Sequence, residues 1–197
     1  MHFAIDPTRT PEGTTVRYDI ESKGSTFIVR AFTTGLLAAF GHNPTIAIPD
    51  IGGEILLNPD AVEQSTLRMV AHAASLTVTD DISAKDREEI NQRMHGEVLE
   101  SESYPDIVYE SSRVSASKTG EGQYWAAITG ELEMHGVKHS QPISARLSLN
   151  GDTLRATGEF SVRQSDYEIR PVSAVGGAVK LKDELKLSFD IKARKHA

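Results

Sequence analysis

The sequence predicts an all-β fold, an antiparallel barrel of about eight strands with one α-helix and a short helical lid. Most segments alternate apolar and polar residues with a period of two, and short turns at hairpin spacing join them. Residues 83–100 instead follow the period of an α-helix. A sheet with one apolar face either stacks on another sheet or closes on itself, and we expect closure because small residues stand at inward positions of the central strands. Alternatively, these small residues only make room for the helix or for large neighbours such as Phe160 and Met134.

The clearest alternation lies in residues 123–149. Positions 124–134 alternate apolar or small residues with polar ones, blurred only by Trp125 and Ala127, and such alternation is typical of a strand wetted on one side. The chain turns at His135-Gly136-Val137, and the alternation restarts over residues 143–149. We therefore expect an antiparallel pair with one apolar face. Asn150-Gly151 follows directly and is the strongest two-residue hairpin signal in the chain.

Upstream of this pair, residues 16–20 and 26–30 are expected to form the first hairpin, because Gly24 supplies the backbone freedom that a short turn needs. Residues 33–44 hold a short apolar cluster between two glycines, and we predict the helical lid there. Further strands are expected at residues 46–48, 51–57 and 67–78.

Residues 83–100 break the two-residue period. Ser83, with an acidic residue three positions later, resembles a capping box, which marks the start of a helix. Ile90, Met94 and Val98 recur at a spacing of four residues and form one apolar stripe. We predict a helix whose stripe covers one opening of the barrel. Strands are expected to resume at residues 106–114, 154–162 and 179–191.

Composition limits the function further. A chain of 197 residues suits one domain, with residues 1–13 as a flexible N-terminal arm. The absence of Cys excludes disulfides, thiolate catalysis and Cys-ligated zinc. A net charge of −7 argues against a nucleic-acid partner. No segment approaches the ~20 apolar residues of a membrane span, and the N-terminus does not look like an export signal, so we expect a cytoplasmic protein without stable membrane insertion.

Four motifs carry a family resemblance. The first is GELEMHGVKHSQP at residues 130–142; the others are residues 24–29, the 104–109 segment after the predicted helix, and residues 160–167. In this order they resemble the signature of the YceI-like, polyisoprenoid-binding family. The resemblance implies a lipocalin-like barrel around a long apolar cavity, and a binding protein instead of a catalyst. The chain departs from the family pattern at Glu168 and in Gly41-His42-Asn43-Pro44, and we do not expect it to carry the export signal of many relatives.

On this basis we expect an apolar small-molecule ligand inside the barrel and no cofactor. The ligand would be a polyisoprenoid, an isoprenoid quinone or another lipid, such as one with a fatty-acyl chain. Alternate residues of the central strand and large apolar residues elsewhere would line the cavity. The predicted lining is Phe27, Val29, Leu36, Leu37, Phe40, Met69, Tyr109, Tyr124, Ala126, Ile128, Gly130, Leu132, Met134, Leu147, Ala156 and Phe160.

A polar or anionic headgroup would need partners at the cavity mouth. A guanidinium matches phosphate geometry, although such Arg residues more often pair with surface carboxylates. Histidines in turns can serve the same purpose or simply bond nearby backbone. The candidate headgroup contacts are Arg30, His42, His135, Arg163 and Arg170.

Histidines also raise a competing hypothesis. His135 and His139 stand four residues apart, and His42 or His95 could complete a three-His metal site. The alternative function is thus a metal-dependent enzyme that uses His42, His135 and His139. The sequence holds no Gly-rich phosphate loop before a helix and no G-x-S-x-G motif, so we expect no enzyme and no bound metal. A third possible function is an interaction protein whose barrel is filled. The sequence is also compatible with a homodimer.

Overall fold

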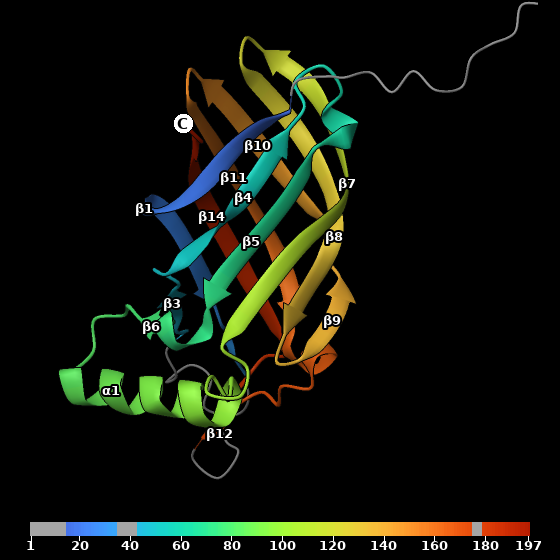
Figure 1. Ribbon diagram of the computed structural model, residues 1–197. Helices are drawn as coiled ribbons and strands as arrows, with labels where there is room; N and C mark the ends of the chain where they lie inside the picture. The colour runs from blue at the N-terminus through green and yellow to red at the C-terminus, as the bar shows by residue number, and fades with distance from the viewer. Residues whose placement is uncertain (1–14, 35–42, 175–178) are drawn as a thin grey trace, which may run out of the picture.

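The computed structural model describes residues 15–34, 43–174 and 179–197. Eight antiparallel strands follow one another around a closed barrel in the order β14-β11-β10-β8-β7-β5-β4-β1, and β1 pairs back with β14 (Figure 1). The predicted all-β antiparallel barrel is therefore confirmed. The barrel strands are β1 (Val16–Arg30), β4 (Ile51–Leu57), β5 (Thr66–His72), β7 (Asp106–Gly120), β8 (Gln123–Met134), β10 (Ile143–Asn150), β11 (Thr153–Arg163) and β14 (Glu184–Lys195).

Shorter elements gather near one end of the barrel (Figure 1). Strand β3 pairs with the second half of β1, β6 pairs with β3, and β9 pairs with β8. Strands β12, β13 and β2 form a separate small sheet. Their bounds are β2 (Thr33–Thr34), β3 (Thr45–Ala47), β6 (Thr77–Val78), β9 (Val137–Ser140), β12 (Ser173–Ala174) and β13 (Val179–Leu181), and 3-10 turns occupy Val62–Gln64, Ala73–Ser75 and Gln164–Tyr167.

The predicted hairpin between residues 16–20 and 26–30 is wrong, because β1 is one continuous strand. Strand β14 runs beside both halves, with Glu21 opposite Lys192 and Thr26 opposite Asp190. Four residues of β1 therefore face a single residue of β14, which is a bulge. Within it Gly24 adopts a φ of 88°. The same glycine freedom that serves a tight turn here serves the bulge.

The central strands follow the sequence prediction closely. Strands β8 and β10 pair antiparallel, with Ile143 opposite Ile128, and their alternating apolar residues face the barrel interior. Asn150 pairs with Thr153, so β10 and β11 form the tight hairpin that the Asn-Gly signal predicts. The connection from β8 to β10 is more elaborate than expected, because β9 is inserted after the turn at residues 135–136.

Helix α1 (Ala84–Arg93) begins where the capping signal predicts, since the backbone N–H of Asp86 donates to Ser83 Oγ over 3.1 Å. It continues as a π-helical turn, η4 (Met94–Val98). In Figure 1 the helix lies beneath the lower end of the barrel. Its stripe of Ile90, Met94 and Val98 faces that opening. In the described residues no helix is long and apolar enough to cross a membrane.

Two expectations fall mostly outside the described residues. The predicted lid at residues 33–44 includes residues 35–42, and the N-terminal arm at residues 1–13 lies wholly in the undescribed part of the chain. Of the lid segment, Thr33 and Thr34 are described, and they form strand β2 instead of a helical turn. They are extended because they pair with Leu181 and Lys180 of β13.

The turn after β8 gives a first test of this fold. Gly136 has a φ of 75°, and a Cβ placed on it would lie 2.8 Å from Cε1 of Tyr104. Gly136→Ala should therefore lower the free energy of unfolding by about 1–2 kcal/mol, the usual cost of a left-handed non-glycine residue. Gly120→Ala is the control, because its nearest new contact, to Cβ of Gln123 at 3.6 Å, is an ordinary one. Equal unfolding midpoints in denaturant would contradict the described turn.

Candidate ligand-binding cavity

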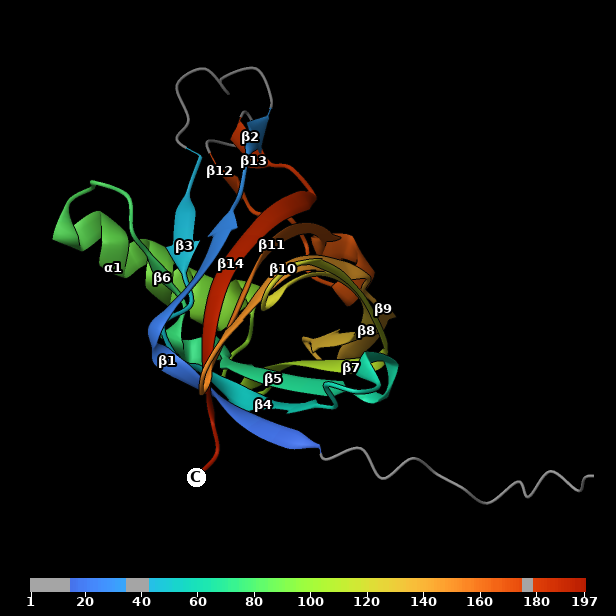
Figure 2. The same ribbon diagram turned by 90° about the horizontal axis from the view of Figure 1, so that it is seen from above.

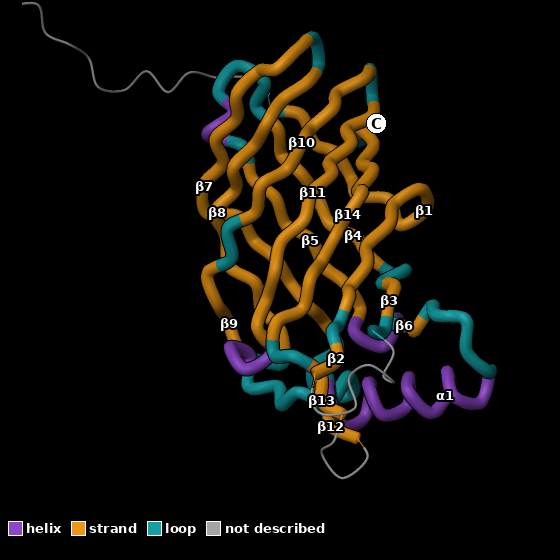
Figure 3. Tube along the Cα trace, turned by 180° about the vertical axis from the view of Figure 1, so that it is seen from behind, coloured by secondary structure: helices purple, strands orange, loops and turns teal. Residues whose placement is uncertain are grey.

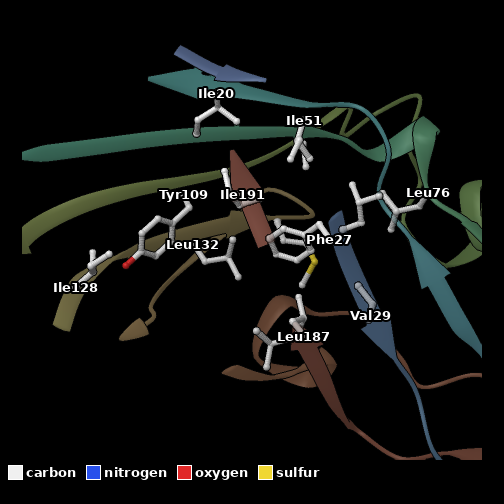
Figure 4. Close-up of a cluster of buried hydrophobic side chains, with 14 of the residues drawn as sticks. Ile20, Phe27, Val29, Ile51, Leu76, Tyr109, Ile128, Leu132, Leu187 and Ile191 are labelled. Atoms are coloured by element: carbon white, nitrogen blue, oxygen red, sulfur yellow. The ribbon is translucent and has the colours of Figure 1, made fainter. Parts of the chain in front are cut away.

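An apolar cavity of about 450 Å³ occupies the part of the barrel nearest helix α1. All eight barrel strands contribute inward side chains to its wall. Figure 4 shows several of them converging, with Phe27 near Leu132, Leu187 and Ile191. The rings of Phe27 and Phe189 stack at a centroid distance of 6.1 Å, and Phe160 meets both rings at 6.3 Å. Aromatic pairs at such distances pack favourably, so this cluster is a rigid piece of the wall.

The far end of the barrel is filled. Side chains there are buried against one another and do not border the cavity, which therefore ends in a closed floor. The layer just above that floor contains Ile20, Ile128 and Ile191. The residues that fill the far end include Tyr18, Leu57, Val114, Ala126, Leu154 and Ala193.

The mouth of the cavity lies between helix α1 and the small sheet of β2, β13 and β12, which Figure 2 shows on two sides of the barrel end. Ile90 at this rim is 41% exposed. Arg93 and Lys180 are the charged side chains in the described part of the lining. Nε of Arg93 donates to Glu97 over 2.9 Å. The mouth thus combines apolar groups with two cations, whereas the interior is almost wholly apolar.

Tyr109 is the main polar group inside the wall. Its hydroxyl donates to the backbone carbonyl of Gln141 over 3.0 Å, which satisfies it without water. Burial disfavours the phenolate and raises the pKa of Tyr109 to about 12. The group therefore stays neutral at physiological pH and offers no charge to a ligand.

The structure places many of the predicted lining residues in this wall and leaves others out. Ala126 and Gly130 lie on the inward face of β8 but do not border the cavity. Tyr124 and Leu147 lie toward the filled end and are also excluded. Three further predictions, Leu36, Leu37 and Phe40, lie outside the described residues. The predicted residues that do line the cavity are Phe27, Val29, Met69, Tyr109, Ile128, Leu132, Met134, Ala156 and Phe160.

Two inward glycines have a simple steric explanation. A Cβ on Gly130 would lie 2.7 Å from the Tyr109 ring, and one on Gly158 would lie 2.7 Å from the Phe189 ring. These glycines therefore make room for large rings on neighbouring strands and leave no open volume. At these two positions the small residues make room for large neighbours, as the alternative interpretation of the sequence held. The neighbours are Tyr109 and Phe189, however, and not Phe160 and Met134.

None of the described headgroup candidates lies in the cavity wall. Arg30 and Arg163 end strands and are exposed because their side chains alternate with the inward ones, and Arg170 is exposed in the irregular segment that follows the 3-10 turn. Arg163 borders a separate, mostly polar pocket of about 230 Å³ beside Tyr167. His42 lies outside the described residues. The cations at the mouth are instead Arg93 and Lys180.

The histidines of the central motif have structural contacts. His135 adopts a φ of 54° in the turn, and its ring lies 4.4 Å from that of Tyr104. Its Nδ1 is 3.3 Å from the carbonyl oxygen of Tyr167. His139 meets the Tyr167 ring edge-on at 5.3 Å. In residues 15–34, 43–174 and 179–197, no three His, Asp or Glu side chains are grouped so that they could hold a metal ion.

Sequence reasoning missed several wall residues. Arg93 stands three positions after Ile90 and one before Met94, so the helical period of the predicted stripe could have identified it. Leu187 and Phe189 belong to a strand whose alternation is plain in the sequence. Lys180 gives no such signal, because β13 leaves the barrel and pairs with β2 and β12.

Comparisons with known proteins agree with this architecture. The family profile of the YceI-like domain matches residues 10–193. Burkholderia cenocepacia BcnA has a similar fold, with 16% identity and a TM-score of 0.67 over 88% of this chain and 98% of that one. So does a polyisoprenoid binding domain from Saccharophagus degradans implicated in plant cell wall breakdown, with 11% identity and a TM-score of 0.67 over 92% and 99%. A Campylobacter jejuni YCEI protein shows 14% identity and a TM-score of 0.58 over 77% and 85%. No curated protein matches the sequence.

The packing around Gly130 can be tested directly. Gly130→Ala would bring Cβ within 2.4 Å of the Glu110 carbonyl oxygen and 2.7 Å of the Tyr109 ring, so it should destabilise the fold by about 1–3 kcal/mol, as overpacking does. Gly52→Ala is the matched control, because nothing lies within 4 Å of its new methyl group. Urea unfolding of both variants measures the difference. Were Gly130→Ala as stable as the control, this position would be open space and part of a larger cavity.

Proposed function

The chain belongs to the YceI-like domain family, and on this premise we propose that it binds a long-chain apolar ligand inside the barrel without catalysing a reaction on it. The observation that carries the proposal is the cavity itself: its interior is almost wholly apolar, it is closed at one end and, in the described residues, it opens between α1 and β13. Pockets of ~300–1,000 Å³ commonly hold small molecules. The volume of about 450 Å³ falls within that range.

The shape of the site favours a chain over a compact ligand. In the described residues the cavity opens at the mouth, so a ligand that enters there passes α1 and extends toward the floor near Ile20, Ile128 and Ile191. A polyisoprenoid, an isoprenoid quinone or a fatty-acyl lipid meets this requirement. Burial of such a chain gains about 0.8 kcal/mol per CH₂ from the hydrophobic effect. The relative from Saccharophagus degradans, a polyisoprenoid binding domain of the same fold, supports the first of these classes.

The same geometry supports carriage of the ligand as part of this proposal. A chain whose apolar part is enclosed can cross water, while the mouth remains the route of loading and release. The apolar wall offers Tyr109 as a neutral, already bonded hydroxyl. The alternative histidine enzyme has less support, because His135 and His139 do not border the cavity.

A cavity-filling variant tests the proposal. Ala156 lines the cavity, so Ala156→Trp should occupy the space and weaken the binding of a fluorescent long-chain probe at least about tenfold, a loss of ~1.4 kcal/mol. Because the indole would enter existing empty space, the melting temperature should change little.

Ala127→Trp is the control, because Ala127 is exposed on the outer face of β8. It should bind the probe as the parent does. If the parent binds no probe, or if Ala156→Trp binds it unchanged, the proposed function is wrong. Loss of folding in Ala156→Trp would show that the interior is already filled.

A further inference from the structure

Four cations gather on the outer surface at the end of the barrel that carries the mouth. Arg30 ends β1, Lys186 stands near the start of β14, and Lys182 and Lys180 lie in or beside β13. All four are exposed. We call Arg30, Lys182 and Lys186 the basic corner, and Lys180 links it to the mouth because it also lines the cavity.

Two of these cations are placed at an energetic disadvantage. Arg30 and Lys186 stand directly opposite each other in the β1–β14 pair, and like charges at such positions repel. In the described part of the chain, no cation of the basic corner forms an ion pair with a carboxylate. Nζ of Lys186 instead lies 5.8 Å from the ring centroid of Phe32. The corner therefore presents positive charge that the described chain does not neutralise.

Two carboxylates, those of Asp183 and Glu184, lie close in sequence to the basic corner. Asp183 accepts hydrogen bonds from the backbone N–H and the hydroxyl of Ser165, at 2.8 and 2.6 Å, and these bonds hold the pKa of its carboxyl below the usual range. Glu184 stands opposite Arg163 in the β11–β14 pair. Helix α1, whose sequence includes Asp86, Glu88 and Glu89, lies on the other side of the mouth (Figure 2). In the described residues, neither Asp183 nor Glu184 forms an ion pair with a cation of the basic corner.

The position of the corner indicates its partner. The backbone N–H of Lys182 donates to the Phe32 carbonyl over 2.7 Å, which fixes the corner to the small sheet that borders the mouth. Figure 3 shows β2 and β13 directly below the start of β14. The rim also exposes Ile90. A surface that offers anionic groups and apolar chains together is an anionic lipid membrane, whereas a soluble anion or a nucleic acid offers no partner for the apolar opening.

We propose that the basic corner docks the barrel on an anionic membrane surface, with the cavity mouth facing the lipid. The net charge of −7 opposes approach from a distance. At physiological salt, however, charges are screened beyond about 8 Å, so the face that touches the membrane decides the outcome. Polybasic surfaces bind anionic leaflets in this way. This docking rests on the proposed function, because the membrane would be the surface from which the ligand is loaded. The residues of the basic corner themselves lie outside the cavity wall.

Vesicle flotation tests the proposal with the full chain. We expect binding to vesicles of phosphatidylcholine with an equal amount of phosphatidylglycerol, weaker binding at high salt, and little binding to phosphatidylcholine alone. Arg30→Glu/Lys186→Glu should bind the anionic vesicles at least about tenfold more weakly. Lys118→Glu/Lys195→Glu is the control: it makes the same charge change with two exposed residues at the filled end of the barrel, and it should bind as the parent does.

Both variants should still bind the long-chain probe in detergent-free buffer, because none of their residues lines the cavity. This second readout separates failure of docking from failure of ligand binding. If Arg30→Glu/Lys186→Glu folds poorly, Arg30→Gln/Lys186→Gln removes the charges more mildly and should weaken vesicle binding in the same direction. Equal binding to both vesicle types, equal loss in the control variant, or corner-dependent binding of duplex DNA without vesicle binding would overturn the proposal.

Discussion

The pairing of β1 with β14 is the constraint on which the rest of the molecule depends. Without it the sheet would keep two open edges, and open edges invite aggregation. Strand β1 meets β14 along both halves, β4 along its first half and β3 along its second. The bulge at residues 22–25 makes this possible by bending the strand. It also shifts the alternation, so Ile20 and Phe27, seven positions apart, both face the cavity.

Much of this fold could be predicted from alternation because the barrel strands are wet on one side only. Residues 124–134, apart from Trp125 and Ala127, and residues 143–149 keep a period of two, which marks Ile128 and Ile143 as inward, and the two residues do pair. The first strand could not be predicted in the same way. A polar run with Gly24 has the same composition in a bulge as in a hairpin turn, and only β14, near the other end of the chain, distinguishes the two.

The sequence predicts which side chains of the site point into the barrel, but not how far along the barrel axis each one lies. Alternation identifies Phe27, Ile128 and Leu132 as inward, and they do line the cavity. It equally marks Ala126, which is completely buried toward the filled end. Height along the barrel depends on strand tilt and on the neighbouring rings, as the contact between Gly130 and Tyr109 illustrates. The cations of the mouth depend on where the helix and β13 sit over the opening, which the strand period does not encode.

The central proposal is that an apolar chain binds in the barrel from the floor to the mouth. Mass spectrometry of the freshly purified protein, intact and after organic extraction, tests it most directly. We expect a mass increment on the intact protein that extraction removes, and a single class of long-chain lipid in the extract. A protein that carries no lipid, and that gains no mass when a polyprenol or a fatty acid is added, would contradict the claim.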